Sequence, residues 1–198
     1  MRIRQPIVSV LGHVDSGKTS LLDKVRGTGV QEREAGGITQ HIGASFLPVE
    51  TIQKICGPLY EKLSKAEHKI PGILVIDTPG HEVFTNLRSR GGSAADIAIL
   101  VVDANRGFQP QTNESLKILE SRKVPFVVAL NKTDMISGWK DTQTQFITQA
   151  IKEQNTQVQT FLDEKIYNVV TALSVLGYQS EAFYRVQEYK KEIAIVPV

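Results

Sequence analysis

The 198-residue sequence has a single cysteine and no long hydrophobic run. One cysteine cannot form a disulfide within the chain, which excludes a disulfide-stabilised fold and favours a reducing compartment. We expect Cys56 to be a small buried residue. The longest apolar runs, 124–130 and 97–102, are far shorter than the roughly 18 to 20 residues of a membrane span. The N-terminal residues lead at once into a strand-like segment and not a signal-peptide core. We therefore expect a soluble, cytoplasmic protein with no membrane partner.

The chain also lacks a marked excess of charge of either sign. It has 23 Lys and Arg against 21 Asp and Glu, a formal net charge of +2. Such a balance, without a basic block, does not by itself indicate nucleic-acid binding. The hydrophobic content of 41%, with 15 Gly and 8 Pro, is near the globular average and argues against disorder, collagen-like repeats and coiled coil. The length predicts one domain.

Short apolar runs alternate with amphipathic stretches along the chain. The runs read as buried strands at 7–11, 73–76, 97–102, 126–130 and 193–198, and the intervening patterns predict helices at 18–26, 82–90 and 111–121. Pro110 suits the start of the last helix. Near-continuous apolar strands separated by helices predict a doubly wound α/β domain, with helices on both faces of a mostly parallel sheet.

Two stretches, at about 49–66 and 139–190, are longer than ordinary connections. In the first, a helical pattern is interrupted at Gly57-Pro58, which predicts two short helices. In the second, apolar residues at helical spacing predict one long helix closed by Gly177; they are Val158, Leu162, Ile166, Val169, Leu173 and Leu176. The Gln- and Thr-rich segment 142–160 predicts a polar helix and a loop, with a disordered linker as the alternative.

A phosphate-binding motif, G-x-x-x-x-G-K-[ST], follows the first predicted strand and opens a predicted helix. It reads Gly12-His13-Val14-Asp15-Ser16-Gly17-Lys18-Thr19. In this context backbone N–H groups of the loop and of the helix N-terminus bind phosphates. Lys18 would reach the β and γ phosphates, and Thr19 would give its hydroxyl to Mg²⁺. We predict nucleotide contacts from Val14, Asp15, Ser16, Gly17, Lys18, Thr19 and Ser20; the alternative is a simple glycine turn before a helix.

A second motif, Asp77-Thr78-Pro79-Gly80, follows the strand at 73–76. Ligands of open α/β sheets bind at this carboxyl edge. Asp77 can hold Mg²⁺ through water, and Gly80 can bring its N–H close to a γ-phosphate because it has no side chain. Taken alone, the same four residues make a competent turn.

The third motif, Asn131-Lys132-Thr133-Asp134, closes the strand at 126–130. An ionised carboxylate only accepts hydrogen bonds, so Asp134 can bind a base edge that presents two donors, as guanine does. Asn131 can meet the acceptors of the base, and the stem of Lys132 can lie over the ring. An Asx turn at a strand end is the alternative.

Together these motifs resemble the translational GTPases, and more narrowly the class of translation initiation factor 5B, the archaeal and eukaryotic counterpart of bacterial initiation factor two. The more specific part of the likeness is the run Gly36-Gly37-Ile38-Thr39-Gln40-His41-Ile42-Gly43-Ala44. The helical pattern near 52–63 is similar to the archaeal and eukaryotic members. The resemblance covers essentially the whole chain and implies a Ras-like P-loop fold.

The resemblance implies roles for residues that the motifs leave open. Thr39 matches the first switch threonine, which closes on Mg²⁺ and the γ-phosphate, and 77–82 matches the second switch. His81 matches the histidine associated with GTP hydrolysis, with Val14 and Ile38 as its apolar gate. From its place beside Gly80, His81 can also position water and stabilise charge. We therefore predict His81, Gly80 and Lys18 as the catalytic residues; a structural His81 is the alternative.

Asp15 is unusual because a carboxylate beside phosphates is costly unless a cation lies between them. We predict that Asp15, with a backbone carbonyl near Gly37, binds K⁺ or Na⁺ beside the β and γ phosphates, as in the family. In the alternative, Asp15 turns away and bonds N–H groups of the loop.

The predicted function is a GTP-hydrolysing switch that promotes ribosomal subunit joining. Mg²⁺ is its cofactor, and its partners are GTP or GDP, the ribosome and, through further domains, initiator tRNA and other initiation factors. We expect a monomeric GTP-binding domain over 1–198 that stops before a Ser-Ala motif of the family. The alternatives are the GTP-binding domain of an elongation-type factor and a GTP-binding interaction module with little turnover.

Overall fold

The computed structural model describes residues 4–26, 43–63, 70–77, 95–144 and 146–198. These residues form a seven-stranded sheet in the order β2-β3-β1-β4-β5-β7-β6. Only β2 runs antiparallel to its neighbour, β3, and the other pairs are parallel. The strands are β1 (Ile7–Gly12), β2 (Gly43–Pro48), β3 (Gly72–Asp77), β4 (Ile97–Asp103), β5 (Phe126–Asn131), β6 (Ser180–Ala182) and β7 (Ile193–Pro197).

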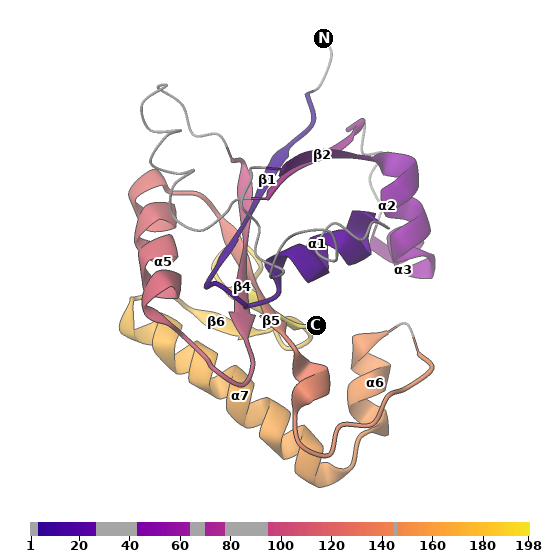
Figure 1. The fold of residues 1–198 in the computed structure, drawn as a ribbon, viewed down its shortest axis with the longest axis vertical. Helices are drawn as coiled ribbons and strands as arrows, with labels where there is room; N and C mark the ends of the chain where they lie inside the picture. Colours follow the sequence, from indigo (N-terminus) through magenta and orange to yellow (C-terminus); the bar gives the residue numbers. More distant parts are fainter. Residues whose placement is uncertain (1–3, 27–42, 64–69, 78–94, 145) are drawn as a thin grey trace.

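Helices cover both faces of this sheet. α5 and α7 lie on one side of it and α1, α2 and α3 on the other (Figure 1). The helices are α1 (Lys18–Arg26), α2 (Val49–Cys56), α3 (Pro58–Leu63), α5 (Pro110–Arg122), α6 (Ile147–Glu153) and α7 (Thr156–Val175), and a 3₁₀ turn, η3, spans Thr133–Met135.

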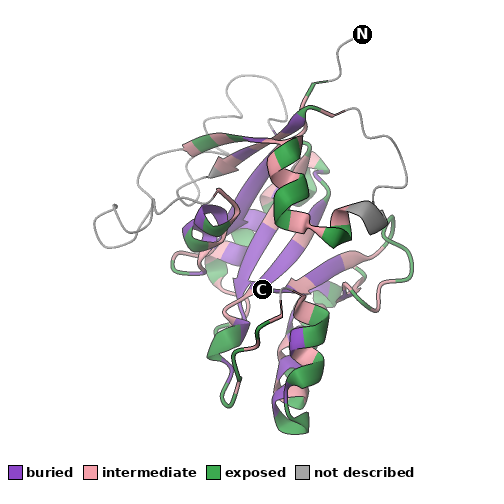
Figure 2. Ribbon diagram, turned by 90° about the vertical axis from the view of Figure 1, so that its right-hand side faces the viewer, coloured by how far each residue is buried: buried purple, intermediate pink, exposed green. Residues whose placement is uncertain are grey.

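Two separate apolar cores result from the alternation of side chains along the strands. On β4, Leu100 is fully buried with α5 and α7, whereas its neighbour Val101 is fully buried with Leu22 of α1 on the other face. The buried strands at the centre of the sheet are seen in Figure 2. Because β1, β4 and β5 are covered on both faces, their carboxyl ends have fixed positions from which loops can present ligand-binding groups.

The ends of α7 follow from local chemistry. The Asn155 side chain accepts a hydrogen bond from the N–H of Val158 at 2.9 Å and so caps the first turn. At the other end Gly177 has a φ of 85°, and the N–H groups of Gly177 and Tyr178 donate to the carbonyls of Ser174 and Leu173. This is the glycine termination that the sequence predicts.

The five predicted strands and the helices at 18–26 and 111–121 are confirmed. So are the break between two short helices at Gly57 and a helix within the polar segment, α6. Two strands, β2 and the three-residue β6, were not predicted from the sequence. The helix predicted at 82–90 lies outside the described residues. The prediction for Cys56 is wrong, because its side chain is only partly buried at the end of α2.

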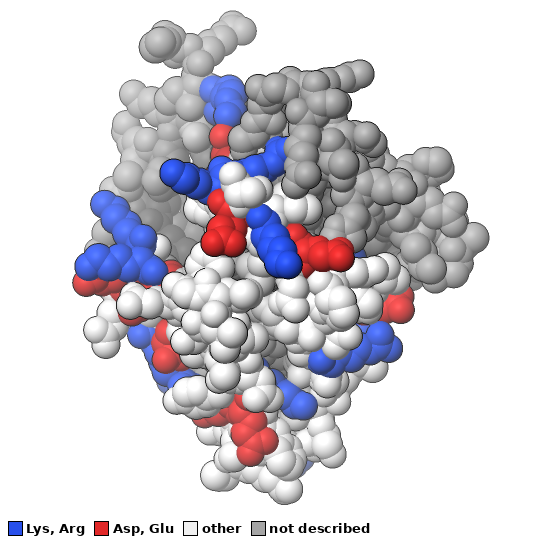
Figure 3. All heavy atoms as spheres, turned by 90° about the vertical axis from the view of Figure 1, so that its left-hand side faces the viewer, with Lys and Arg blue, Asp and Glu red and all other residues white. Residues whose placement is uncertain are grey.

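The described surface carries charges of both signs. On the face in Figure 3, basic and acidic side chains are interspersed. Within the described ranges, no helix combines the length and apolar character that a membrane crossing requires.

Candidate functional site

The carboxyl ends of four parallel strands meet at one edge of the sheet. Val10 of β1 pairs with Asp77 of β3, Gly12 pairs with Val101 of β4, and Asp103 of β4 pairs with Asn131 of β5. The loops that carry the predicted motifs therefore leave the sheet side by side, where ligands of open α/β folds bind.

The phosphate loop, residues 12–19, folds tightly between β1 and α1 (Figure 1). Asp15 has a φ of 62°, and the N–H of Ser16 donates to the carbonyl of His13 at 3.2 Å. Lys18 is buried, and its ammonium donates to the carbonyls of Gly12 at 3.1 Å and His13 at 2.7 Å. The Lys18 side chain is thus hydrogen-bonded to the phosphate loop itself.

Residues 131–134, which the sequence predicts to recognise the base and which we call the base-recognition segment, are bonded directly to the phosphate loop. The Asn131 amide donates to the carbonyl of Ser16 at 2.8 Å, and the Lys132 ammonium donates to the carbonyl of Asp15 at 2.6 Å. Gly17, with a φ of 88°, allows this approach, because a Cβ there would lie 2.2 Å from Asn131 Nδ2. The structure thus brings the first and third predicted motifs together.

Asp103, which the sequence analysis missed, fixes Lys132 from the other side. Its carboxylate lies 2.8 Å from the Lys132 ammonium and accepts the N–H groups of Asn105 and Arg106. Burial raises the pKa of the Asp103 carboxyl, but the bonds from Lys132 and the two N–H groups outweigh it, so the pKa lies below its ordinary value. A signal was present in the sequence, since Asp103 directly follows the apolar run at 97–102 at the same edge.

Gln111 is a second residue that the sequence analysis missed. Its side-chain oxygen accepts the N–H of Val14 at 3.1 Å, which joins the second residue of α5 to the phosphate loop. The amide of Val14 is therefore directed at α5. No spacing rule in the sequence connects two residues 97 positions apart.

The last two residues of the base-recognition segment differ in their surroundings: Thr133 is buried and hydrogen-bonded, and Asp134 is exposed. Thr133 is buried, and both its N–H and its hydroxyl donate to the carbonyl of Val198. Asp134 is exposed in η3. Its carboxylate is therefore accessible from solvent next to an anchored residue.

The remaining predicted residues lie on the phosphate loop, on α1 and at the end of β3, or outside the described ranges. Thr19 is buried in the first turn of α1, Ser20 is exposed beside it, and Asp77 ends β3. Asp15 is exposed. Five predicted residues lie outside the described ranges, namely Gly37, Ile38, Thr39, Gly80 and His81.

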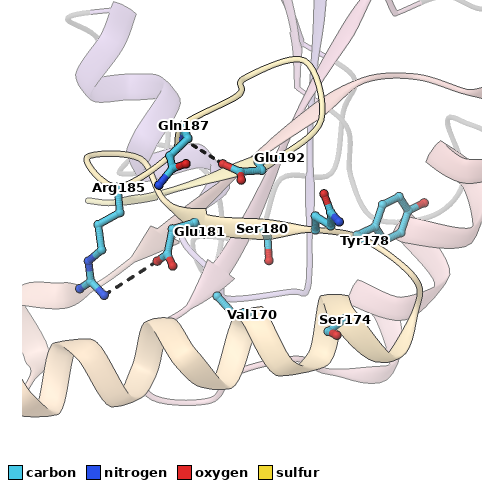
Figure 4. A pocket seen from close by; sticks show the side chains of 9 residues that line it. Val170, Ser174, Tyr178, Ser180, Glu181, Arg185, Gln187 and Glu192 are labelled. Carbon is cyan, nitrogen blue, oxygen red and sulfur yellow. Dashed lines mark hydrogen bonds and ion pairs between the residues drawn. The ribbon is translucent and has the colours of Figure 1, made fainter.

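A hollow of about 420 Å³ lies elsewhere, between α7, β6 and the loop before β7 (Figure 4). It includes none of the predicted site residues. Its charged groups already have partners within the protein, because Arg185 pairs with Asp163 and Glu192 accepts the N–H of Gln187 at 2.9 Å. We therefore place the candidate site at the strand ends and not in this hollow.

A comparison with protein families identifies the domain. The model of the elongation factor Tu GTP binding domain matches residues 3–192. The chain belongs to this family. The translational GTPase resemblance drawn from the motifs is thereby confirmed, as is the P-loop GTPase fold.

Individual relatives of this GTP binding domain point to one class of factor. The chain is 56% identical over 195 residues to a probable translation initiation factor IF-2 of Methanopyrus kandleri, covering 98% of the chain and 32% of that protein. It is 57% identical over its whole length to another from Sulfurisphaera tokodaii, covering 33% of that protein. The chain thus spans about a third of the length of these curated relatives.

Two solved structures are similar to the chain. The crystal structure of GDP-bound aIF5B from Aeropyrum pernix matches the whole chain and 33% of that chain, with 53% identity and a TM-score of 0.84. The bacterial selenocysteine-specific elongation factor EF-Sec, at 22% identity and a TM-score of 0.56 over 98% of this chain and 26% of its own, shares the fold.

Proposed function

We propose that this GTP binding domain binds GTP and GDP at the strand-end site and hydrolyses GTP as a molecular switch. The observation that carries the proposal is the direct bonding of Asn131 and Lys132 to the phosphate loop. This bonding supports the proposal, because a single nucleotide requires its base-binding and phosphate-binding segments to be held at a fixed separation. In this arrangement Asp134 accepts the N1–H and amino group of guanine, and the loop N–H groups bind the phosphates.

Mg²⁺ is the cofactor of this proposal. The site suits it, because the hydroxyl-bearing Thr19 lies in the first turn of α1 and Asp77 ends β3, the strand beside β1. Hydroxyl, water and phosphate oxygens are the ligands that Mg²⁺ prefers. Thr19 and Thr39 would bind the ion directly and Asp77 through water. The ion would neutralise charge that develops on the γ-phosphate, while Lys18 leaves the loop carbonyls for the phosphates.

For hydrolysis we propose His81 as the residue that positions the attacking water, with Gly80 donating its N–H to the γ-phosphate. The support is the match of 77–82 to the second switch of the family. Val14 and Ile38 would gate His81 until the ribosome rearranges it. Groups supplied by a partner raise phosphoryl-transfer rates by about 10³ to 10⁵, so the free chain should hydrolyse GTP slowly.

Asp15 and a carbonyl near Gly37 remain our candidates for a monovalent cation, K⁺ or Na⁺. The support is that the Asp15 side chain is exposed on the phosphate loop, while its own carbonyl is used by Lys132. Hydrolysis rates that are equal in K⁺, Na⁺ and a bulky organic cation, for both the chain and Asp15→Ala, would reject this site.

The wider task that we propose is ribosomal subunit joining within a translation initiation factor, acting in the cytoplasm with initiator tRNA and other factors bound by further domains. The support is the identity of 56–57% to proteins named probable translation initiation factor IF-2, and of 53% to aIF5B. In this proposal residues 1–198 are one GTP binding domain, with helical insertions at about 49–66 and 139–190.

Two measurements test the function. Calorimetry with GDP, GTP and ATP should give heat with the guanine nucleotides alone, and binding of ATP with equal affinity would reject the proposal. Phosphate release from GTP should rise when ribosomes are added, and His81→Ala should remove the rise while GTP binding persists. Binding without any stimulated release would favour the interaction module instead.

A further inference from the structure

We propose that Gln111 is a positioning residue that holds the phosphate loop in its binding conformation through the amide of Val14. The inference rests on the proposed nucleotide site. It assigns a role to a helix, α5, that carries none of the predicted site residues. Gln111 is not among the predicted nucleotide contacts, and its contact with the loop is the bond from the Val14 N–H, so it acts through Val14.

The geometry at Gln111 is specific. The side-chain oxygen accepts the Val14 N–H at 3.1 Å from a half-buried position. Pro110 begins α5, and Gln109 and Thr112 close its first turn with reciprocal hydrogen bonds. Further along the helix, the Ser115 hydroxyl donates to the Gln111 carbonyl at 2.9 Å. The backbone that carries Gln111 is therefore fixed before its side chain reaches the loop.

The bond matters because Val14 precedes Asp15, a non-glycine residue with a left-handed backbone conformation. Asp15 adopts a φ of 62°, which is unfavourable for any residue with a Cβ. The Val14 amide is fixed by Gln111, and the Asp15 carbonyl is fixed by Lys132 at 2.6 Å. These two bonds hold the Val14–Asp15 segment at both of its ends. Without the bond to Gln111, the backbone between Val14 and Asp15 can rotate and relieve the strain at Asp15. The N–H groups that follow in the loop would then no longer point toward the phosphates.

A loop held in advance binds phosphates without a further ordering cost, whereas a loop that must be ordered loses affinity by that cost. A neutral hydrogen bond of this kind corresponds to roughly a twofold to tenfold change in an equilibrium constant. Gln111 should therefore affect nucleotides in proportion to their phosphate contacts, and it should not affect the choice of base.

The test compares Gln111→Met, which keeps length and removes the oxygen, with Gln111→Glu, which keeps an acceptor at the same position. Asn113→Met, at an exposed position of the same helix, is the matched control. Amide exchange followed by NMR reads the bond directly in the nucleotide-free chain. Exchange at Val14 should accelerate in Gln111→Met and stay slow in Gln111→Glu and Asn113→Met. Unchanged exchange in Gln111→Met would overturn the proposal.

Affinity then tests the consequence. Gln111→Met should weaken GDP binding about twofold to tenfold, with an unchanged ratio of guanine to xanthine nucleotide affinity. Gln111→Glu adds a charge, so any loss of its affinity should shrink at high salt, while the loss in Gln111→Met should not. Equal affinities for the chain and Gln111→Met would reject the role. If the unaltered chain binds no guanine nucleotide, the proposed function fails, whereas the Val14 exchange result still decides the bond.

Discussion

The Lys132 ammonium lies 2.6 Å from the carbonyl oxygen of Asp15, although 117 positions separate the two residues in the chain. The same ammonium lies 2.8 Å from the Asp103 carboxylate. One side chain thus joins the ends of β4 and β5 to the phosphate loop. Lys132 itself has a φ of 64°, so these contacts also stabilise an unfavourable backbone.

Asp103→Asn should remove the ion pair while keeping an oxygen for the N–H groups of Asn105 and Arg106. We expect a loss of about 1–3 kcal/mol in the free energy of unfolding at neutral pH. The pKa of Asp103 is lowered in the folded chain, so its contribution is full above the unfolded value near 4 and is lost as pH falls through the folded pKa.

Denaturant unfolding of the chain and of Asp103→Asn between pH 7 and pH 3 measures this contribution. The difference between the two proteins should be largest at neutral pH and should shrink below about pH 4. Asp96→Asn, which weakens the exposed contact with Arg4, should cost less at neutral pH. A difference for Asp103→Asn that grows on acidification contradicts the prediction.

Gly17→Ala should disturb the junction of the two loops. The new Cβ would lie 2.2 Å from Asn131 Nδ2 at a φ of 88°. Gly107→Ala is the matched control, because Gly107 has a φ of 64° and no heavy atom within 4 Å of an added Cβ. Backbone strain of about 1–2 kcal/mol applies to both, and crowding adds about 1–3 kcal/mol at Gly17 alone.

Thermal unfolding and GDP titration of both glycine variants separate strain from crowding. Only Gly17→Ala should lose GDP affinity, since Gly107 lies after β4 and outside both loops. Equal losses in the two variants would show that the contact with Asn131 is unimportant.

Asp134→Asn should change the preferred base. The exposed carboxylate accepts from two guanine donors in our proposal, whereas an amide can donate to the second carbonyl of xanthine. We expect GDP affinity to fall by about 10²-fold and xanthosine diphosphate affinity to rise. Competition binding with the two diphosphates measures both. If the order of preference is unchanged, Asp134 does not read the base.

Leu173→Ala should destabilise the core between α7 and the sheet. Leu173 is fully buried, while Val175, two residues further along α7, is 82% exposed. Truncation of Leu173 should cost about 2–5 kcal/mol and that of Val175 about 0.5 kcal/mol or less. Chemical denaturation provides both values, and similar losses at the two positions would contradict the assignment of this helix face.

The sequence was most informative where one local pattern determines the structure. The apolar run at 97–102 is buried on both sides, so it shows its strand character without knowledge of its neighbours. The strand β2 escaped prediction because three of its six residues, Gly43, Ser45 and Pro48, are not strand formers and its pairing partner is β3. The same limit applies to β6, whose three residues are defined by pairing with β7.

For the candidate site too, local patterns were informative and contacts between distant residues were not predicted. Motif spacing predicts Lys18, Asn131 and Asp134 as site residues, because each motif lies on one continuous turn of backbone. Asp103 and Gln111 were not predicted, since each acts on a loop far away in the chain. Contacts of that kind depend on the order of strands in the sheet, which spacing along the chain does not encode.

Gly17 limits which side chains can be introduced at residues 131–134 to change the preferred base. Asn131 rests where any side chain on that glycine would sit, so larger substitutions at either position exclude the other residue's present rotamer. Engineers who want a new ligand preference should therefore vary Asp134 first and leave the Gly17–Asn131 pair as a unit.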